Sequence, residues 1–366
     1  MRRFTIALIF ASFALAQDDD RGYLPPPTVH ADRTVTLRLA APKASDVKFA
    51  IRSAGFKPQP MKKDGAGVWE ITTAPLEPET YEYNFIVDGV LTADPNNHNF
   101  ISTVGRGSRY FEIPSDPPRF DSVRNVPHGA IQIRIYESAM RKTVQQLYIY
   151  VPPSYESSPQ KRYPALYLRH GNGTDESNWS ALGAERAGVI LDNLIADGKA
   201  REMILVMGQG YPLEGPAVTL ASYAQVGEEL LREVIPFVEK TYRISPGREN
   251  RAIAGLSMGA RQSFMIGLSH LDQFAYIGEF SAGGNIADYK VWPSGFLSDP
   301  AATNKNLKLL FLACGTDDPR FEPHNQASSF LKQNNIRHVY FTTPGEHEPK
   351  VWRHAFYEFA QKLFQP

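Results

Sequence analysis

The 366-residue sequence contains a single cysteine, Cys314, so no disulfide can form within the chain and stability must come from a packed core. It lacks any charge excess, because 39 basic residues balance 39 acidic ones, and this argues against nucleic acid or an anionic membrane surface as a partner. No apolar stretch approaches the roughly 20 residues that span a bilayer. The histidines show no metal-ligand spacing, so neither a metal ion nor another cofactor is expected.

The N-terminus has the three-part pattern of a secretory signal peptide. Arg2 and Arg3 precede an apolar run at 6–15, and small residues follow where cleavage would occur before position 17. The pattern predicts a signal peptide at 1–16, and hence a secreted or periplasmic protein. Residues 17–28 are rich in aspartate and proline and are expected to form a flexible leader.

Residues 29–113 have the pattern of a small all-β domain. Apolar and polar residues alternate in short segments that are separated by Gly, Pro and Asp turns. This pattern predicts an immunoglobulin-like antiparallel β-sandwich. The alternating segments are 35–39, 47–51, 68–71 and 81–87.

The run 81–89, followed by Ala-Asp-Pro-Asn at 93–96, resembles the glycogen-branching-enzyme type of carbohydrate-binding module, family forty-eight. In such modules an exposed aromatic ring can stack on a sugar, and Trp69 and Tyr83 are the candidates in this sequence. Each of the two lies on an alternating strand, however, which favours packing in the core of the sandwich.

The segment 114–121 contains three prolines and is expected to be a stiff polar linker. Beyond it, at 122–366, short apolar strands alternate with helical stretches such as 225–242, whose apolar residues recur at helical spacing. This alternation predicts a doubly wound α/β sheet that begins with an antiparallel pair. The expected strands are 131–137, 144–151, 163–169, 203–207, 251–254, 307–313 and 338–342.

The stretch 251–267 carries the strongest chemical signal. An apolar run leads into Gly-Leu-Ser-Met-Gly at 255–259, and a helix-compatible segment follows. Gly-x-Ser-x-Gly also occurs in ordinary turns, but between a strand and a helix it is typical of the nucleophile elbow of an α/β-hydrolase. Ser257 is therefore the expected nucleophile.

A nucleophilic serine needs a histidine base, which in this fold class follows the serine and the acid along the chain. This order leaves His324 and His347, because the other histidines precede Ser257 or lie within expected helices and strands. His347 is preferred because it lies in a loop between the last strand and the last helix.

The acid is expected in the loop after the strand 307–313. Two aspartates, Asp317 and Asp318, lie there, and spacing alone does not choose between them. Cys314, just before them, is expected to be a buried residue at the end of the strand and not a nucleophile.

The oxyanion hole of this fold class uses two backbone N–H groups. One belongs to the residue after the nucleophile, Met258. The second is expected from the glycine-containing loop at 168–173, with Asn172 as the donor. His170 in this loop is expected to support it by hydrogen bonds.

With these residues the chain resembles the esterase D-like α/β-hydrolases, in particular the bacterial feruloyl and acetyl xylan esterases of carbohydrate esterase family one. The resemblance implies that the triad acid closes a Cys-Gly-Thr-x-Asp run, which makes it Asp318 and not Asp317. It also implies an acylated polysaccharide or oligosaccharide as the substrate. The matching segments are 168–173, 235–239, 255–259, 314–318 and 347 with 351–353.

Three functional hypotheses follow. A secreted serine esterase that removes feruloyl or acetyl groups from plant xylan accounts for the signal peptide, the N-terminal β-sandwich and the triad together. An enterochelin-type siderophore esterase is the alternative, because those enzymes also pair a β-sandwich with this hydrolase. A non-catalytic carbohydrate-binding protein on a hydrolase scaffold would explain the fold, but not the set Ser257, His347 and Asp318.

Overall fold

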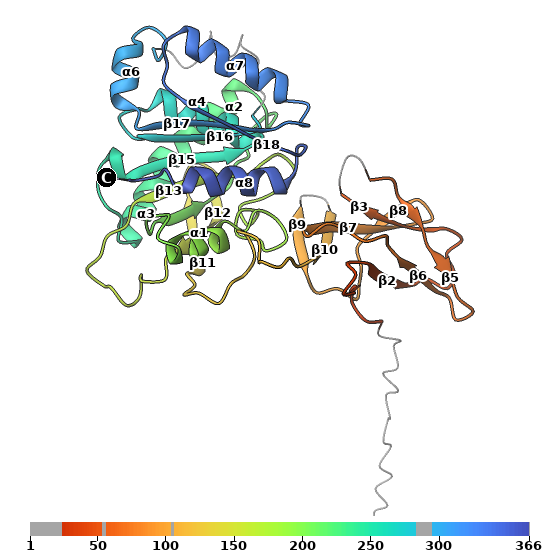
Figure 1. The fold of residues 1–366 in the computed structure, drawn as a ribbon. Helices are drawn as coiled ribbons and strands as arrows, with labels where there is room; N and C mark the ends of the chain where they lie inside the picture. The colour runs from red at the N-terminus through yellow and green to blue at the C-terminus, as the bar shows by residue number, and fades with distance from the viewer. Residues whose placement is uncertain (1–23, 53–55, 104–105, 283–294, 366) are drawn as a thin grey trace, which may run out of the picture.

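The computed structural model describes residues 24–52, 56–103, 106–282 and 295–365. Figure 1 shows a β-rich N-terminal domain beside a larger domain of strands and helices. The predicted signal peptide, 1–16, and most of the predicted leader lie outside the described residues. Thr28, at the end of that leader, already belongs to the first strand, where it lies opposite Thr36. No helix of the described part is long and apolar enough to cross a membrane.

The N-terminal domain consists of two antiparallel sheets, as the alternating segments predicted. Four strands that no alternation had indicated, β4 (Gln59–Pro60), β8 (Val90–Thr92), β9 (Phe100–Thr103) and β10 (Arg106–Glu112), complete the larger sheet. The smaller sheet has the order β1 (Thr28–Val29), β2 (Val35–Ala40), β6 (Val68–Thr72) and β5 (Lys62–Lys63). The larger has β4 (Gln59–Pro60), β3 (Val47–Ile51), β7 (Thr80–Val87), β10 (Arg106–Glu112) and β9 (Phe100–Thr103), with β8 (Val90–Thr92) also pairing with β7.

Both candidate sugar-stacking rings are part of the sandwich core. Trp69 is 7% exposed and its indole N–H donates to the carbonyl of Ala41 at 2.9 Å. Tyr83 is fully buried, and its hydroxyl donates to the Asp94 carboxylate at 2.6 Å. The expectation of core packing is confirmed, and neither ring can stack on a sugar in this arrangement.

The larger domain is built on an eight-stranded sheet. Strand β12 (Thr143–Val151) is antiparallel to both of its neighbours, β11 (Ala130–Ser138) and β14 (Ile204–Met207), and all pairs from β14 onward are parallel, which confirms the doubly wound α/β prediction. The strand order is β11 (Ala130–Ser138), β12 (Thr143–Val151), β14 (Ile204–Met207), β13 (Ala165–Arg169), β15 (Arg251–Leu256), β16 (Tyr276–Phe280), β17 (Leu309–Gly315) and β18 (Val339–Thr343).

Helices cover both faces of this sheet (Figure 1). The apolar side chains of α1 (Ala187–Ala196) and α8 (Pro349–Ala360) pack on one face. Those of α2 (Leu220–Glu229), α3 (Ile235–Thr241), α4 (Met258–Ser269) and α7 (Phe321–Gln333) pack on the other, and the short α6 (Pro300–Asn306) precedes β17. The segment 225–242, predicted as one helix, is the end of α2, a π-helical turn at Leu230–Val234 and then α3.

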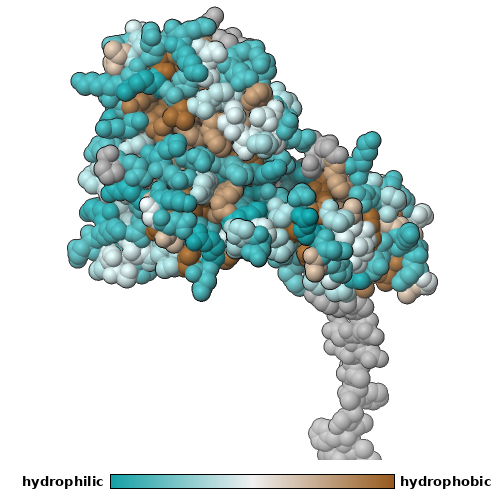
Figure 2. All heavy atoms as spheres, in the orientation of Figure 1, coloured by the Kyte–Doolittle hydropathy of each residue, from teal (hydrophilic) through white to brown (hydrophobic). Residues whose placement is uncertain are grey.

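Charged side chains join the two domains. Arg353 of α8 is 2% exposed and forms ion pairs with Glu79 of the sandwich and with Asp121. A second pair joins Arg186 to Glu112 of β10 at 2.7 Å. Figure 2 shows the two domains in contact, and the side of the molecule in this view is mostly hydrophilic. Asp121, the last residue of the predicted linker, is therefore buried in the domain junction.

One buried carboxyl near this junction leads to a stability prediction. Glu185 is 1% exposed, accepts a hydrogen bond from Asn178, and lies near the positive charge of Arg353. Burial nevertheless raises the pKa of Glu185 to about 8. Between its ordinary pKa of 4.5 and about 8, the unfolded chain loses this proton while the folded protein keeps it, so stability falls as the pH rises.

Glu185→Gln removes this titrating group. We therefore expect the difference in the free energy of unfolding, variant minus wild type, to be about 2–4 kcal/mol larger at pH 8 than at pH 4. The measurement is the free energy of unfolding of both proteins between pH 4 and pH 9. A difference between variant and wild type that stays constant across this range would contradict the prediction.

Candidate active site

The local fold around Ser257 is that of a tight turn between a strand and a helix. Strand β15 ends at Leu256 and α4 begins at Met258, so Ser257 alone makes the turn, with φ +53° and ψ −113°. The two flanking glycines are required by space. A Cβ on Gly255 would lie 2.6 Å from the backbone of Gly259, and one on Gly259 would lie 2.4 Å from the carbonyl oxygen of Arg169.

The structure brings Ser257, His347 and Asp318 into one hydrogen-bonded chain. The Ser257 Oγ lies 3.0 Å from His347 Nε2, and His347 Nδ1 lies 2.8 Å from Asp318 Oδ2. Because a carboxylate only accepts, Nδ1–H is the donor to Asp318, which leaves Nε2 to accept the serine hydroxyl. These are the contacts a nucleophile, a base and an orienting acid require.

Asp318 is held as an anion. Burial of this 3% exposed residue raises its pKa, but hydrogen bonds from His347 and from the backbone N–H of Arg320 outweigh that effect, so the pKa lies below its ordinary value. Asp317 is exposed and does not contact the imidazole; its carboxylate accepts the N–H of Gly345 at 3.1 Å. Of the two aspartates, the structure thus brings Asp318 to His347, and its role as the triad acid stays a prediction.

The loop that carries His347 is supported by an aromatic side chain. The ring of Trp352, in the first turn of α8, packs edge-on against the imidazole, with 4.9 Å between ring centroids and an interplanar angle of 85°. This contact limits the orientations open to His347. Because Arg353 is the next residue, the segment that supports His347 also anchors the sandwich.

The other two histidines considered for the site have different surroundings. His324, on α7, is 1% exposed and lies 3.7 Å from Glu279, and burial lowers its pKa to about 4. His170 supports its loop as predicted: Nδ1 donates to the carbonyl of Gly171 and Nε2 accepts the N–H of Gly210, both at 2.8 Å. Burial lowers the pKa of His170 to about 4, so it is neutral at neutral pH.

The predicted oxyanion loop lies against Ser257. A Cβ on Gly171 would be 3.6 Å from the Cβ of Ser257, so the backbone passes close to the serine. Met258, at the first position of α4, presents its N–H at the helix N-terminus. Asn172 is exposed at the tip of the loop, and the N–H of Gly173 is bound by the hydroxyl of Tyr211 at 2.6 Å. Asn172 remains the predicted second donor. The sequence had not indicated the contact of Tyr211 with this loop.

Cys314 does not contribute a nucleophile here. It is fully buried within β17, and burial raises the pKa of its thiol to about 12. Among the described residues no group of His, Cys, Asp and Glu side chains could hold a metal ion.

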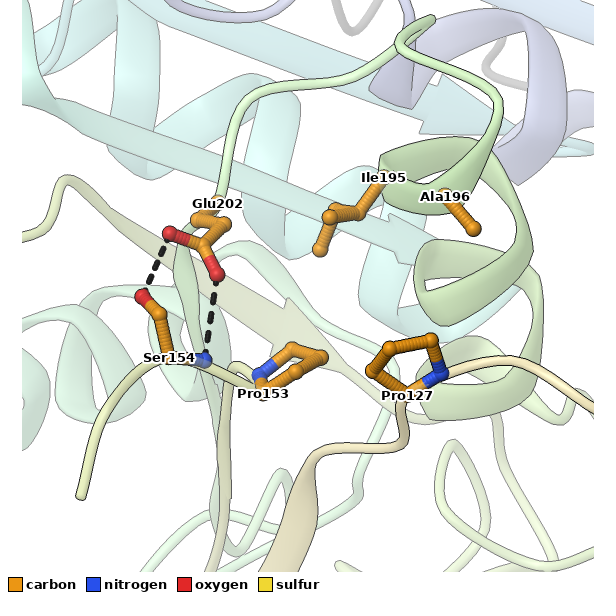
Figure 3. A pocket seen from close by; sticks show the side chains of 6 residues that line it. All are labelled: Pro127, Pro153, Ser154, Ile195, Ala196 and Glu202. Carbon is orange, nitrogen blue, oxygen red and sulfur yellow. Dashed lines mark hydrogen bonds between the residues drawn. The ribbon is translucent and has the colours of Figure 1, made fainter. Parts of the chain in front are cut away.

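A cavity of about 330 Å³ opens elsewhere on the domain (Figure 3). It is lined by Pro127, Pro153, Ser154, Ile195, Ala196 and Glu202, which are not members of the triad. Glu202 precedes β14 while Ser257 follows β15, so the cavity lies at the opposite end of the parallel strands. The Glu202 carboxylate already accepts a hydrogen bond from Ser154 and pairs with Lys161, which fits a structural role for this glutamate.

Comparison with known proteins identifies the family of this chain. Residues 138–365 match the model of the Esterase family. This chain belongs to that family. The chain is also 31% identical over 347 residues to the endo-1,4-beta-xylanase/feruloyl esterase of Xylanibacter ruminicola, an alignment that covers 93% of this chain but 46% of the relative. The chain thus spans less than half the length of that relative.

Solved structures show the same fold. The ferulic acid esterase of Anaeromyces mucronatus, described as a CE1 enzyme, is 26% identical, with a TM-score of 0.57 over 69% of this chain and 98% of its own. The enterobactin esterase of Shigella flexneri is 18% identical, with a TM-score of 0.64 over 94% of this chain and 97% of its own, so it shares the fold of both domains. The resemblance to carbohydrate esterase family one is confirmed. The likeness of the sandwich to a family forty-eight module stays a prediction.

Proposed function

We propose that this esterase-family protein is a serine carboxylic-ester hydrolase that acts through an acyl-enzyme. The observation that carries the proposal is the chain of two hydrogen bonds, 3.0 Å and 2.8 Å long, that joins Ser257 through His347 to Asp318. The strained turn at Ser257 adds support, because such backbone strain persists where a function requires it.

In the proposed mechanism each of these residues has a step. His347 Nε2 removes the Ser257 proton as the Oγ attacks the ester carbonyl, and the resulting imidazolium is stabilised by the Asp318 carboxylate. The negative charge on the carbonyl oxygen is stabilised by the N–H of Met258 and by that of Asn172. His347 then protonates the leaving alcohol, and a water molecule, activated by the same imidazole, hydrolyses the acyl-enzyme.

Feruloyl or acetyl esters on xylan are the proposed substrates. The support is the 31% identical relative, whose name joins a xylanase to a feruloyl esterase, and the 26% identical solved structure, which is named a ferulic acid esterase. The partner of this protein would then be an acylated polysaccharide or oligosaccharide.

A substrate panel tests this choice. Methyl ferulate, acetylated xylan and a catecholate siderophore ester should be compared at equal enzyme concentration by kcat/KM. We expect one of the first two to be hydrolysed at least about tenfold faster than the siderophore, a difference of about 1.4 kcal/mol in transition-state stabilisation. The reverse order would favour the siderophore esterase, and no turnover of any ester would favour a binding protein.

Export is also part of the proposal. Arg2, Arg3 and the apolar run at 6–15 support it, because they have the pattern of a secretory signal peptide. The proposed substrate also supports it, since hydrolysis of a polysaccharide requires the enzyme outside the cytoplasm. Mass spectrometry of the protein from an expressing cell tests it. A mature N-terminus at Gln17 is expected, whereas an intact Met1 terminus in the cytoplasmic fraction would argue against export.

A further inference from the structure

The oxyanion loop has a neighbour that the triad does not include. Tyr211 lies in the loop after β14, and the loop after β13 contains Gly173. The two strands are parallel neighbours, with Leu168 opposite Met207, so their following loops emerge side by side at the same edge of the sheet. There the Tyr211 hydroxyl accepts the backbone N–H of Gly173 at 2.6 Å.

This bond determines which N–H groups of the loop can face a substrate. Gly173 has φ +86°, a conformation that glycine adopts without strain. Its N–H is directed at Tyr211 and is therefore not available to a developing oxyanion at Ser257. The remaining candidates are the N–H groups of the two preceding residues, whose peptide planes are set by the position of Gly173.

The backbone of Tyr211 is held in place by two hydrogen bonds. Its carbonyl accepts a 2.6 Å hydrogen bond from Arg141, and its N–H donates to the side-chain oxygen of Gln209 at 3.0 Å. Arg141 is held by a bidentate pair with Glu229, both bonds 2.6 Å long. Bidentate Arg–carboxylate pairs fix orientation as well as charge, so the tyrosine backbone has little freedom.

The π-helical turn explains how this anchor is assembled. Glu229 ends α2, and the turn Leu230–Val234 follows it directly. Within that turn Glu233 accepts hydrogen bonds from the Ser138 hydroxyl at 2.6 Å and from the N–H of Met140 at 2.8 Å. Two carboxylates from one helical segment thus hold the connection between β11 and β12, which contains Arg141. Such π-helical insertions are rare and often lie at functional sites.

A second link joins the same two loops. His170 donates to Gly171 and accepts from Gly210, so its ring connects the start of one loop to the other, while Tyr211 connects the end. The rings of His170 and Tyr211 lie 5.3 Å apart. Together the two side chains hold the oxyanion loop at both ends.

We propose that Tyr211 is a positioning residue for catalysis: its hydroxyl binds the Gly173 N–H and thereby orients the Gly171–Asn172 backbone toward the oxyanion that forms at Ser257. The inference rests on the proposed ester hydrolysis at Ser257. It predicts a loss that is specific to the transition state, because the loop geometry matters most when charge develops on the substrate oxygen.

Tyr211→Phe tests it by removing one oxygen atom. We expect kcat on the best ester of the panel to fall roughly tenfold to a hundredfold, with KM changing less than about threefold. Phenylboronic acid, which forms a reversible tetrahedral adduct with the serine oxygen, should bind more weakly by a similar factor. Binding of the intact ester, measured in a Ser257→Ala background with and without the substitution, should be unchanged.

Two further variants make the result decisive. Tyr242→Phe is the matched control, because the Tyr242 hydroxyl is also hydrogen-bonded, accepting from Arg134 and donating to Gln132, but away from the oxyanion loop. It should retain full kcat. Arg141→Lys keeps the charge but loses the fork that joins Glu229 to the Tyr211 carbonyl, and it should repeat the loss in kcat and in boronate affinity.

Wild-type kcat and boronate affinity in Tyr211→Phe would overturn the inference while leaving the proposed function intact. Equal losses for the boronate and the intact ester would also overturn it, since they would indicate a general structural role. Failure of the proposed function looks different: the wild-type protein would hydrolyse no ester, or Ser257→Ala would remain active.

Discussion

Ser257→Ala is expected to lower ester hydrolysis by roughly four to six orders of magnitude and to leave the protein folded. The chemical reason is that the acyl-enzyme forms on the serine oxygen, which no neighbouring group can replace. Stability should change by less than about 1 kcal/mol, because the Ser257 hydroxyl contacts His347 and contributes little packing, and alanine meets the same backbone strain. The measurements are kcat/KM on a soluble ester and the free energy of unfolding.

Ser257→Gly provides the matched comparison. It should be equally inactive but more stable than Ser257→Ala by about 1–3 kcal/mol, because glycine adopts φ +53° and ψ −113° without a Cβ penalty. The elbow would then be a place where the protein gives up stability for reactivity. Substantial activity in either variant would show that the hydrolysis takes place elsewhere on the protein.

His347→Ala should be comparably damaging, and the double variant with Ser257→Ala should be no less active than the worse single variant. Each step that His347 performs belongs to a reaction that takes place on the Ser257 oxygen, so the two losses are not additive. A double variant far below both singles would indicate that the two side chains work separately.

Much of the fold was predictable because local patterns and tertiary structure agree. Strands β2, β3, β6 and β7 were found from alternation, β11 and β12 were expected as an antiparallel pair, and β13, β14, β15, β17 and β18 were found from short apolar runs. Strand β16 was missed, because Gly278 and Glu279 interrupt its apolar run although both are buried. A buried glutamate has no signature in a single sequence, since its partners come from elements far along the chain.

The candidate site also has a part that the sequence predicts and a part that it does not. The contact between Ser257 and His347 was predictable, since a strained turn needs glycines at fixed offsets and a histidine base is expected after the last strand. Tyr211 was not, because it binds a backbone N–H, which every residue except proline has. The available signal was positional: Tyr211 follows the strand next to that of the oxyanion loop. Loops that emerge from neighbouring parallel strands should be examined as pairs.

Asp318→Asn is expected to lower kcat by several orders of magnitude, although the substitution removes no packing. In the wild type Asp318 Oδ2 accepts the proton on His347 Nδ1, which leaves Nε2 free to accept the serine proton. An asparagine can turn its NH₂ group toward Nδ1, and the imidazole then carries its proton on Nε2, where it cannot act as a base. The buried carboxylate also stabilises the imidazolium that forms during attack, and a neutral amide does not.

The adjacent residue is the control for this effect. Asp317→Asn keeps an oxygen that can accept the Gly345 N–H, so turnover should stay within about threefold of wild type and stability within about 1 kcal/mol. Asp317→Ala removes that bond and should cost somewhat more, because the same loop carries His347. The measurement is kcat for the three variants on one soluble ester. A large loss for Asp317→Asn with little for Asp318→Asn would mean that the 2.8 Å contact between Asp318 and His347 does not orient the base.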